Sequence, residues 1–418
     1  MTLFPTTLAE QFLSLRATTL ELTVALSAED QSVQSMLSSS PVKWHLAHST
    51  WFFEALILQA FDASYQPFDP AYHYLFNSYY EALGERQPRA ARGLLTRPSL
   101  ADVHTYREHV NLAVVRWLQA VSVDAEGWGE ALKLFELGLH HEQQHQELLI
   151  TDMLHALAQN PLQPSWGLAL PSAALQSERP NQETTWLSFA GGIQSVGHAG
   201  DANKGFAFDN ETPKHDVLLR PFALAEKLVS CAEYLAFIEA GGYTCADWWL
   251  SDGWALVQAE GWRAPMYWQQ TKVKEKEAAK AWQVFGLQGL QPIEPTAAVT
   301  HLSFYEAAAY AAWAGARLPT EFEWEVAATS STPPAQMHGT AWQWTRSSYD
   351  PYPGFRPLDG AVSEYNGKFM VAQIVLRGSS AYTPCAPIAH ARDTYRNFFP
   401  ASARWQCTGL RLAKDLTQ

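Results

Sequence analysis

The segment GLHHEQQHQELLITDMLH, residues 138–155, contains the pattern that decides the fold of the first half of the chain. His141 and His145 lie four residues apart, so that on an α-helix both side chains project from one face and can chelate one metal ion. Gln144 shares that face. Leucines flank the polar residues and indicate a partly buried helix: Leu134, Leu137, Leu148 and Leu149. The spacing therefore predicts a metal-binding helix.

A third ligand is expected from SPVKWHLAHSTWFFEAL, residues 40–56, because two histidines leave a metal site incomplete. Ser40 can cap the helix that this segment forms. When the helix is projected at about 100° per residue, Trp44, His48 and Trp51 fall in one stripe, which should face the bundle interior. His45 lies to the side of that stripe. We therefore predict His48 as the third ligand, the alternative being a histidine that only fills the core.

The letters HEQQH also satisfy HExxH, the signature of zinc proteases, in which Glu142 would be the general base. No Glu or His follows at the spacing of the metzincin group. Three neutral imidazoles without a carboxylate suit oxidative iron chemistry as well as zinc hydrolysis. The residues alone therefore leave an iron site and a zinc hydrolase both open.

Hydrophobic periodicity divides the chain into two domains with a linker between them. Four apolar-periodic segments predict a four-helix bundle over residues 1–160: 6–26, 41–62, 99–121 and 129–157. Residues 161–184 are rich in Pro, Ser and Gln and read as a linker. Residues 185–418 alternate short strand-like runs with turns and contain helical segments at 230–240 and 303–315, which predicts an α+β domain.

Charge and composition exclude several classes of partner. The net charge is −13 and no polybasic block occurs, so that binding to nucleic acid or to an anionic membrane is not expected. The start of the chain lacks the basic and apolar regions of a signal peptide, and no run of 18 apolar residues predicts a membrane span. We expect a cytoplasmic protein with reduced thiols, because no CxxC pair occurs among Cys231, Cys245, Cys385 and Cys407.

Many segments, in the same order along nearly the whole chain, resemble the ergothioneine-type sulfoxide synthases. These segments include WHLAHSTWFFE (44–54), HHEQQHQELLITD (140–152), FAFDNETPKH (206–215), ARLPTEFEWE (316–325) and YRNFFP (395–400). Members of that family join a DinB-like four-helix bundle to a formylglycine-generating-enzyme-like domain with a C-type-lectin-like fold. The resemblance implies this architecture here.

The resemblance also implies an activity, which is oxygen-dependent formation of a carbon–sulfur bond on the imidazole of hercynine, the trimethylated betaine of histidine. By position, His48, His141 and His145 match the family's ligands to Fe(II), and O2 is the co-substrate. Gln144 and Asn397 match residues that face hercynine. The resemblance, rather than the helical spacing, selects iron over zinc.

Aromatic residues supply further candidates. Tyr79 and Tyr80 match a tyrosine pair found in one branch of the family, where a hydroxyl can donate a proton or hydrogen; the alternative is a packed pair. The trimethylammonium group of hercynine is best held by aromatic faces. Phe398, Phe399 and Trp405 are candidate walls for it, or ordinary core residues.

An arginine-rich loop precedes the third predicted helix. Its basic side chains can clamp a carboxylate of hercynine or of the second substrate, with a solvated surface as the alternative: Arg86, Arg89, Arg92 and Arg97.

Three departures from the family pattern concern the second substrate. Gln343 stands where the family usually has Glu, Cys407 where it has Phe, and GSSAYTPCAP, residues 378–387, replaces a Gly-Gly-Ser-Cys type of segment. We expect these changes to alter the charge and volume of the donor pocket. The donor is therefore either cysteine or γ-glutamylcysteine, or a thiosugar or selenosugar as in the selenoneine synthase branch.

Cys385 and Cys407 do not form the close pair that formylglycine generation uses, so we expect that activity to be absent. A catalytically silent protein that only binds a betaine is the alternative to an enzyme.

Overall fold

A computed structural model describes residues 5–78, 84–169, 183–201, 205–271, 281–357, 362, 366–367 and 369–416. The chain forms two compact units. Unit 1 comprises the described parts of Met1–Leu162, Pro357–Lys368 and Thr383–His390. Unit 2 comprises those of Gln163–Arg356, Phe369–Tyr382 and Ala391–Gln418.

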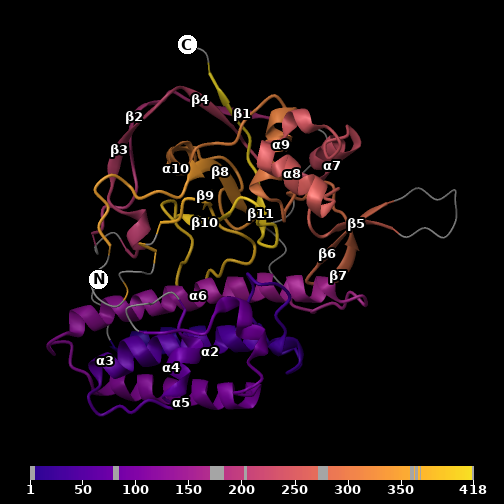
Figure 1. Ribbon diagram of the computed structural model, residues 1–418. Helices are drawn as coiled ribbons and strands as arrows, with labels where there is room; N and C mark the ends of the chain where they lie inside the picture. Colours follow the sequence, from indigo (N-terminus) through magenta and orange to yellow (C-terminus); the bar gives the residue numbers. More distant parts are fainter. Residues whose placement is uncertain are drawn as a thin grey trace. The chain divides into compact units, whose positions relative to one another are not determined.

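Unit 1 is a helical bundle. Its helices are α1 (Pro5–Glu21), α2 (Val42–Phe53), α3 (Gln59–Phe61), α4 (Ala71–Phe76), α5 (Leu100–Ala120) and α6 (Trp128–Gln159). A π-helical segment, η2 (Glu54–Leu58), joins α2 to α3, and the 3-10 turns are η1 (Asp30–Ser32) and η4 (Arg89–Leu94). Both α1 and α2 pack against α5 and α6. Figure 1 shows α2 between α5 and α6. The predicted bundle is confirmed. No described helix has the length and apolar character needed to cross a bilayer.

Helix α2 is the core of the bundle, because every residue from Val42 to Phe53 is buried. Helix α6 approaches it closely at Gly138, where an added Cβ would lie 2.8 Å from the Phe53 ring. The capping role predicted for Ser40 is wrong. Pro41 occupies the N-cap of α2 without a side-chain hydrogen bond, while the Ser40 hydroxyl accepts one from Arg92.

A segment from the second half of the sequence folds with unit 1. The Gln143 carboxamide on α6 donates hydrogen bonds to the carbonyl oxygens of Ala386 (3.1 Å) and Ile388 (2.9 Å). The Thr383 hydroxyl donates to Glu147 on the same helix at 2.7 Å. Residues 383–390 are therefore held along α6 by side chains at both ends of one helical turn.

Unit 2 is the predicted α+β unit. Its strands are β1 (Trp186–Phe189), β2 (Gly192–Val196), β3 (His215–Leu219), β4 (Phe222–Ala225), β5 (Trp268–Gln270), β6 (Trp282–Gly286), β7 (Gly289–Pro292), β8 (Trp342–Ser348), β9 (Gln373–Arg377), β10 (Asn397–Pro400), β11 (Thr408–Gly409) and β12 (Ala413–Asp415). Its helices are α7 (Cys231–Glu239), α8 (Ser251–Glu260), α9 (Phe304–Trp313) and α10 (Glu321–Ala328), with 3-10 turns η7 (Asp209–Glu211) and η8 (Ala246–Trp248).

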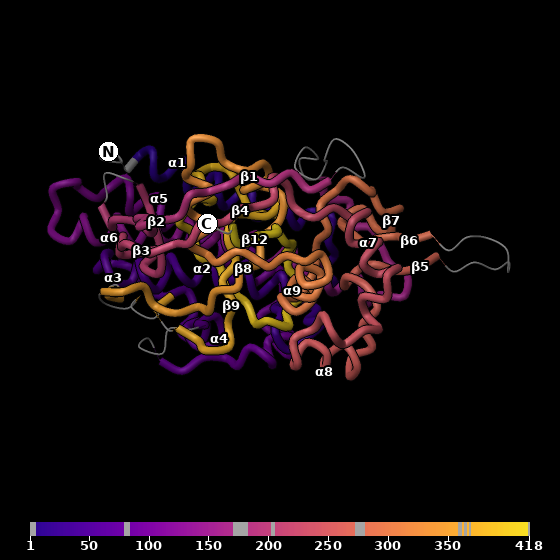
Figure 2. The backbone as a smooth tube through the Cα atoms, turned by 90° about the horizontal axis from the view of Figure 1, so that it is seen from above, coloured from indigo at the N-terminus to yellow at the C-terminus, as the bar shows by residue number. Residues whose placement is uncertain are grey.

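Within the described residues, the strands form four small sheets, in the orders β1-β4-β12, β10-β9-β8-β11, β2-β3 and β5-β6-β7. Strands β5, β6 and β7 lie side by side in Figure 2. Helices α7, α9 and α10 each begin with a capping box, in which a Ser or Thr and the Glu three residues later satisfy each other's backbone N–H groups. These local signals explain why the helices begin where they do.

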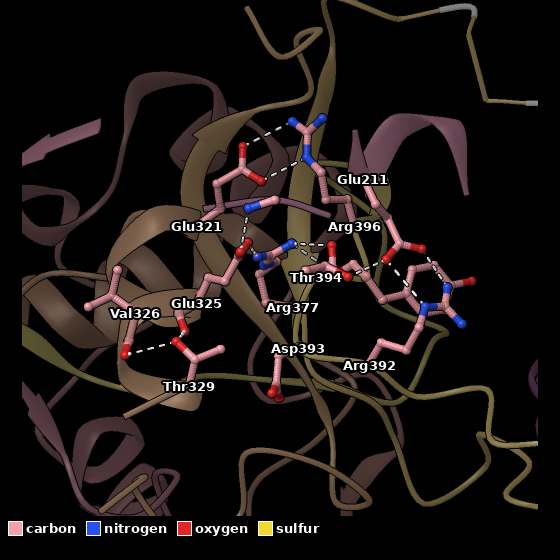
Figure 3. Close-up of polar contacts among 12 residues, drawn as sticks. Glu211, Glu321, Glu325, Val326, Thr329, Arg377, Arg392, Asp393, Thr394 and Arg396 are labelled. Atoms are coloured by element: carbon pink, nitrogen blue, oxygen red, sulfur yellow. Dashed lines mark hydrogen bonds and ion pairs between the residues drawn. The ribbon is translucent and has the colours of Figure 1, made fainter. Parts of the chain in front are cut away.

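Buried ion pairs hold in place the residue that precedes β10 and the neighbouring strand β9 (Figure 3). Arg396 binds Glu321 of α10 through two nitrogens, at 2.8 and 3.0 Å. Arg377 of β9 pairs with Glu325, one turn further along α10. Charges taken out of water require such partners. Strand β10, which carries Asn397, is thereby anchored to α10 and β9.

Candidate metal centre

Three histidines meet in the interior of unit 1. His48 comes from the middle of α2, and His141 and His145 come from α6. One ligand atom from each lies within 4.8 Å of the others, and this is the one such group of metal-binding side chains in the described part of the chain. The Nε2 atoms of His48 and His141 are 3.2 Å apart. Two nitrogens that each lie about 2.1 Å from one ion would be separated by roughly 3.0–3.4 Å.

The protonation of the triad suits a divalent cation. Burial lowers the pKa of His48 and of His145 well below the ordinary value, and lowers that of His141 to about 3. The Nδ1 atom of His48 lies 2.5 Å from the Phe76 carbonyl oxygen, to which it must donate, so that Nε2 keeps its lone pair. Neutral imidazoles with a free lone pair are the form that binds metal, and these residues therefore fit one.

Aromatic stacking fixes the ring of His48. Trp44 stacks on it with centroids 4.5 Å apart, and Trp51 with centroids 5.6 Å apart. The Arg92 guanidinium in turn lies over the Trp44 ring, 3.3 Å from its centroid. Trp44, His48 and Trp51 therefore lie together on one side of α2, as helical projection predicted, although every residue of this helix is buried.

Sequence reasoning missed His45. Its Nδ1 lies 2.8 Å from Nδ1 of His145, and its Nε2 lies 3.2 Å from a carboxylate oxygen of Asp152. The available signals were a histidine one turn before His48 and an acid two turns after His145. Projection of a single helix excluded His45, because it does not show what a neighbouring helix contributes.

Glu142 does not face the triad, and the zinc hydrolase alternative is therefore wrong. The carboxylate has no exposed surface. It accepts hydrogen bonds from Arg107 (2.5 Å), Thr19 (2.6 Å) and Arg16 (2.8 Å), which come from α5 and α1. A general base must reach a metal-bound water. Glu142 instead ties three helices together.

The other candidates from unit 1 have different surroundings. Gln144 is partly buried on α6, between the two ligand positions of that helix. Tyr79 and Tyr80 lie outside the described residues. Arg86 donates to the carbonyl oxygen of Ser78.

The remaining arginines of the loop divide by exposure. Arg89 and Arg97 are exposed. Arg92 is buried and donates to the hydroxyls of Ser40 (2.9 Å) and Ser78 (3.1 Å). For Arg92 the solvated-surface alternative is wrong, since its guanidinium belongs to the stack around His48.

Asn397, Phe398 and Phe399 occupy successive positions of β10 in unit 2. Neighbouring residues of a strand point to opposite faces. Accordingly, Phe398 stacks on Tyr349 with centroids 3.9 Å apart, whereas Phe399 contacts Trp405 edge to face. The three aromatic walls expected for a trimethylammonium group therefore do not form one cage: Phe398 belongs to a different face from Phe399 and Trp405.

The expectation that Gln343 and Cys407 line a donor pocket is also wrong. Gln343 is fully buried, and its carboxamide oxygen accepts from Trp324 (2.8 Å) and Arg411 (2.9 Å). Its amide nitrogen donates to two backbone carbonyl oxygens at 3.0 Å. Cys407 is buried in an apolar cluster that includes Ala341. Both residues are core residues of unit 2.

Comparisons with known proteins agree with this architecture. Residues 11–149 match the DinB superfamily, and residues 172–333 match the sulfatase-modifying factor enzyme 1-like domain. The hercynine oxygenase of Mycolicibacterium thermoresistibile is 30% identical over 98% of this chain and 95% of its own length. That of Mycobacterium tuberculosis is 30% identical over 90% of this chain and 91% of its own. The formylglycine-generating enzyme of Streptomyces coelicolor is 31% identical, but over 38% of this chain and 54% of its own.

Proposed function

Because this chain belongs to the hercynine oxygenase family, we propose that it is a non-haem iron(II) enzyme that uses O2 to join sulfur or selenium to the imidazole of hercynine. The observation that carries the proposal is the triad of neutral histidines, two of them buried and His145 partly buried, within a chain similar to hercynine oxygenases along nearly its whole length. The proposed setting is the cytoplasm, since none of the four cysteines is in a disulfide bond.

His48, His141 and His145 would hold the iron, which when bound supplies the activation of dioxygen. Their imidazoles bring no negative charge and occupy three positions, which leaves room for substrates at the metal. We assign Gln144 and Asn397 to contacts with hercynine. Tyr79 or Tyr80 would supply a proton or hydrogen atom during bond formation.

The second substrate is a thiol or selenol. Arg86 and Arg89 are assigned to its carboxylate if it is cysteine or γ-glutamylcysteine. A thiosugar or selenosugar would need fewer charged contacts. Since Gln343 and Cys407 belong to the core of unit 2, their departure from the family pattern does not favour either class.

The test is a competition between donors. Iron-loaded enzyme is incubated with hercynine, air and an equimolar mixture of cysteine, γ-glutamylcysteine, a thiosugar and a selenosugar, and the products are identified by mass. We expect one hercynine adduct that contains sulfur or selenium, together with oxygen consumption. Hercynine binding without oxygen consumption would instead show a catalytically silent betaine-binding protein.

A matched pair of variants ties the activity to the triad. His141→Ala should lose bound iron and turnover together. Glu130→Gln, which changes an exposed side chain on the same helix, should retain both. Full activity of the iron-free His141→Ala protein would refute the proposal.

A further inference from the structure

We propose that His45 and Asp152 are positioning residues that fix the tautomer and ring orientation of His145, so that its Nε2 presents a lone pair to the metal. This inference rests on the triad being a metal site, as in the proposed function. It assigns a role to two residues that neither helical spacing nor the match of motifs singled out.

A continuous series of hydrogen bonds, called here the hydrogen-bond chain, connects Ser40, Asp152, His45 and His145. The backbone N–H of Ser40 donates to Oδ2 of Asp152 at 2.8 Å, and the same oxygen lies 3.2 Å from Nε2 of His45. Nδ1 of His45 then lies 2.8 Å from Nδ1 of His145. His45 and Asp152 are both buried, at 3% and 6% exposure, so water does not compete for these contacts.

The direction of each hydrogen bond follows from its neighbours. Asp152 already accepts from a backbone N–H, and as a carboxylate it can only accept, so Nε2 of His45 carries the hydrogen. An uncharged imidazole with hydrogen on one nitrogen has a lone pair on the other. Nδ1 of His45 therefore accepts, and Nδ1 of His145 donates. Nε2 of His145 is left with its lone pair.

The opposite order would disable the ligand. If Nδ1 of His45 donated, then Nδ1 of His145 would accept and its Nε2 would carry a hydrogen instead of a lone pair. His48 needs no further residue to fix its tautomer, because its Nδ1 faces the Phe76 carbonyl oxygen, which can only accept a hydrogen bond. His145 faces a ring that can either donate or accept, and Asp152 decides between the two.

The arrangement also links two helices across the site. His45 precedes the ligand His48 by one turn of α2, and Asp152 follows the ligand His145 by two turns of α6. Partners that hold the second nitrogen of a ligating histidine commonly change metal affinity about 10- to 100-fold when they are removed. The same range is expected here.

The test compares two substitutions of His45 in the metal-free full-length protein, titrated with Co(II) and followed by visible absorption. His45→Phe keeps a ring but removes the acceptor, and should weaken Co(II) binding about 10- to 100-fold. His45→Asn can place its side-chain oxygen near the position of Nδ1, and should retain the affinity of the unsubstituted protein. Equal affinities for all three proteins, or an Asn variant as weak as the Phe variant, would overturn the proposal.

Ser35→Ala is the matched control. The Ser35 hydroxyl lies 2.7 Å from Nδ1 of His155, which follows Asp152 by one turn of α6. Removal of this hydroxyl breaks one hydrogen bond but leaves the hydrogen-bond chain from Ser40 to His145 intact. Affinity should not change. A loss as large as that of His45→Phe would mean that any disturbance near this end of α6 weakens the site, and the proposal would fail.

A second measurement does not depend on any variant of His45 being folded. In metal-free protein with ¹⁵N-labelled histidine, long-range ¹H–¹⁵N spectra report which ring nitrogen of His145 carries hydrogen, the signal being assigned by its loss in His145→Gln. We expect hydrogen on Nδ1; hydrogen on Nε2 would refute the inference. Neither measurement uses hercynine or O2, so absence of hercynine turnover would sink the proposed function without affecting this result.

Discussion

Glu142 shows how one residue of the HEQQH motif serves the fold instead of the reaction. Burial alone would raise the pKa of this carboxyl, but the guanidinium groups of Arg107 and Arg16 and the hydrogen bonds to Glu142 lower it to about 2. A carboxylate whose pKa lies below its ordinary value stabilises the folded state. The step of one residue from His141 to Glu142 turns the side chain from the metal to the interface with α1 and α5.

Glu142→Gln should therefore destabilise the protein. The substitution leaves two buried guanidinium groups without their anion, a loss for which about 3–5 kcal/mol is typical. We expect a lower midpoint in urea unfolding followed by circular dichroism. Glu130→Gln, on the exposed face of α6, is the control and should unfold like the unsubstituted protein. Unchanged stability of Glu142→Gln would contradict the structural role.

The same carboxyl predicts a dependence of stability on pH. Its folded pKa of about 2 lies below the ordinary value of 4.5. The contribution, about 3 kcal/mol from the difference in pKa, is therefore fully present above pH 4.5 and is lost as the pH falls toward 2. Urea unfolding at steps between pH 6 and pH 3 measures it. Glu142→Gln should show a shallower decline over that range; an identical decline would refute the assignment.

Gln343 yields a prediction about the donor. Its carboxamide is saturated by Trp324, Arg411 and two backbone carbonyl oxygens within unit 2. Gln343→Glu should therefore leave the preference between thiol and selenol donors unchanged, even if it alters thermal stability. The ratio of products in the donor competition is the measurement. A switch of donor class would mean that residue 343 does act on the second substrate.

At the scale of elements, helix α6 presents three faces with different tasks. Glu142 and Gln146 face α1, where Gln146 donates to the Leu15 carbonyl oxygen and the Thr19 hydroxyl. His141 and His145 face α2. Gln143 and Glu147 hold residues 383–390. A period of 3.6 residues permits this division, because positions i and i+4 share a face while i+1 and i+2 do not.

Gln143→Ala should release residues 383–390 from α6 without disturbing the metal site. Two carbonyl oxygens lose their donor, so that the segment opens more readily. Hydrogen–deuterium exchange should become faster in peptides that cover 383–390. Co(II) affinity should be retained, because the substitution does not touch the triad or its hydrogen-bond chain. Unchanged exchange would mean that other contacts hold the segment.

Periodicity predicted the elements better than it predicted their contacts. The four apolar segments of the first half correspond to four helical stretches: α1, the run of α2, η2 and α3, then α5, and finally α6. They were predictable because the apolar periodicity of a helix can be read from a single segment of sequence. The stripe through His48 was predictable for the same reason. His45 was not, because its partner His145 lies 100 residues away on another helix. The placement of residues 383–390 depends on Gln143, more than 240 residues away.

At the scale of the whole molecule, the proposed metal site belongs to one of the two compact units. The three proposed metal ligands, His48, His141 and His145, all belong to unit 1. A metal ion that binds only the folded form stabilises the structure that supplies its coordinating side chains. The stabilisation is about 2.7 kcal/mol when the free ion concentration is 100 times the dissociation constant. Metal binding should therefore stabilise unit 1 more than unit 2.

Zinc(II), which does not react with oxygen, can probe this division. We expect zinc to slow hydrogen–deuterium exchange mainly in α2 and α6, because the triad joins these two helices across the bundle interior. The strands β8 and β9 of unit 2 supply no metal ligand and should change little. His145→Ala should abolish the protection, while Ser35→Ala should keep it. Equal protection in both units would mean that the metal stabilises them as one cooperative structure, and persistence of the effect in His145→Ala would place the zinc elsewhere.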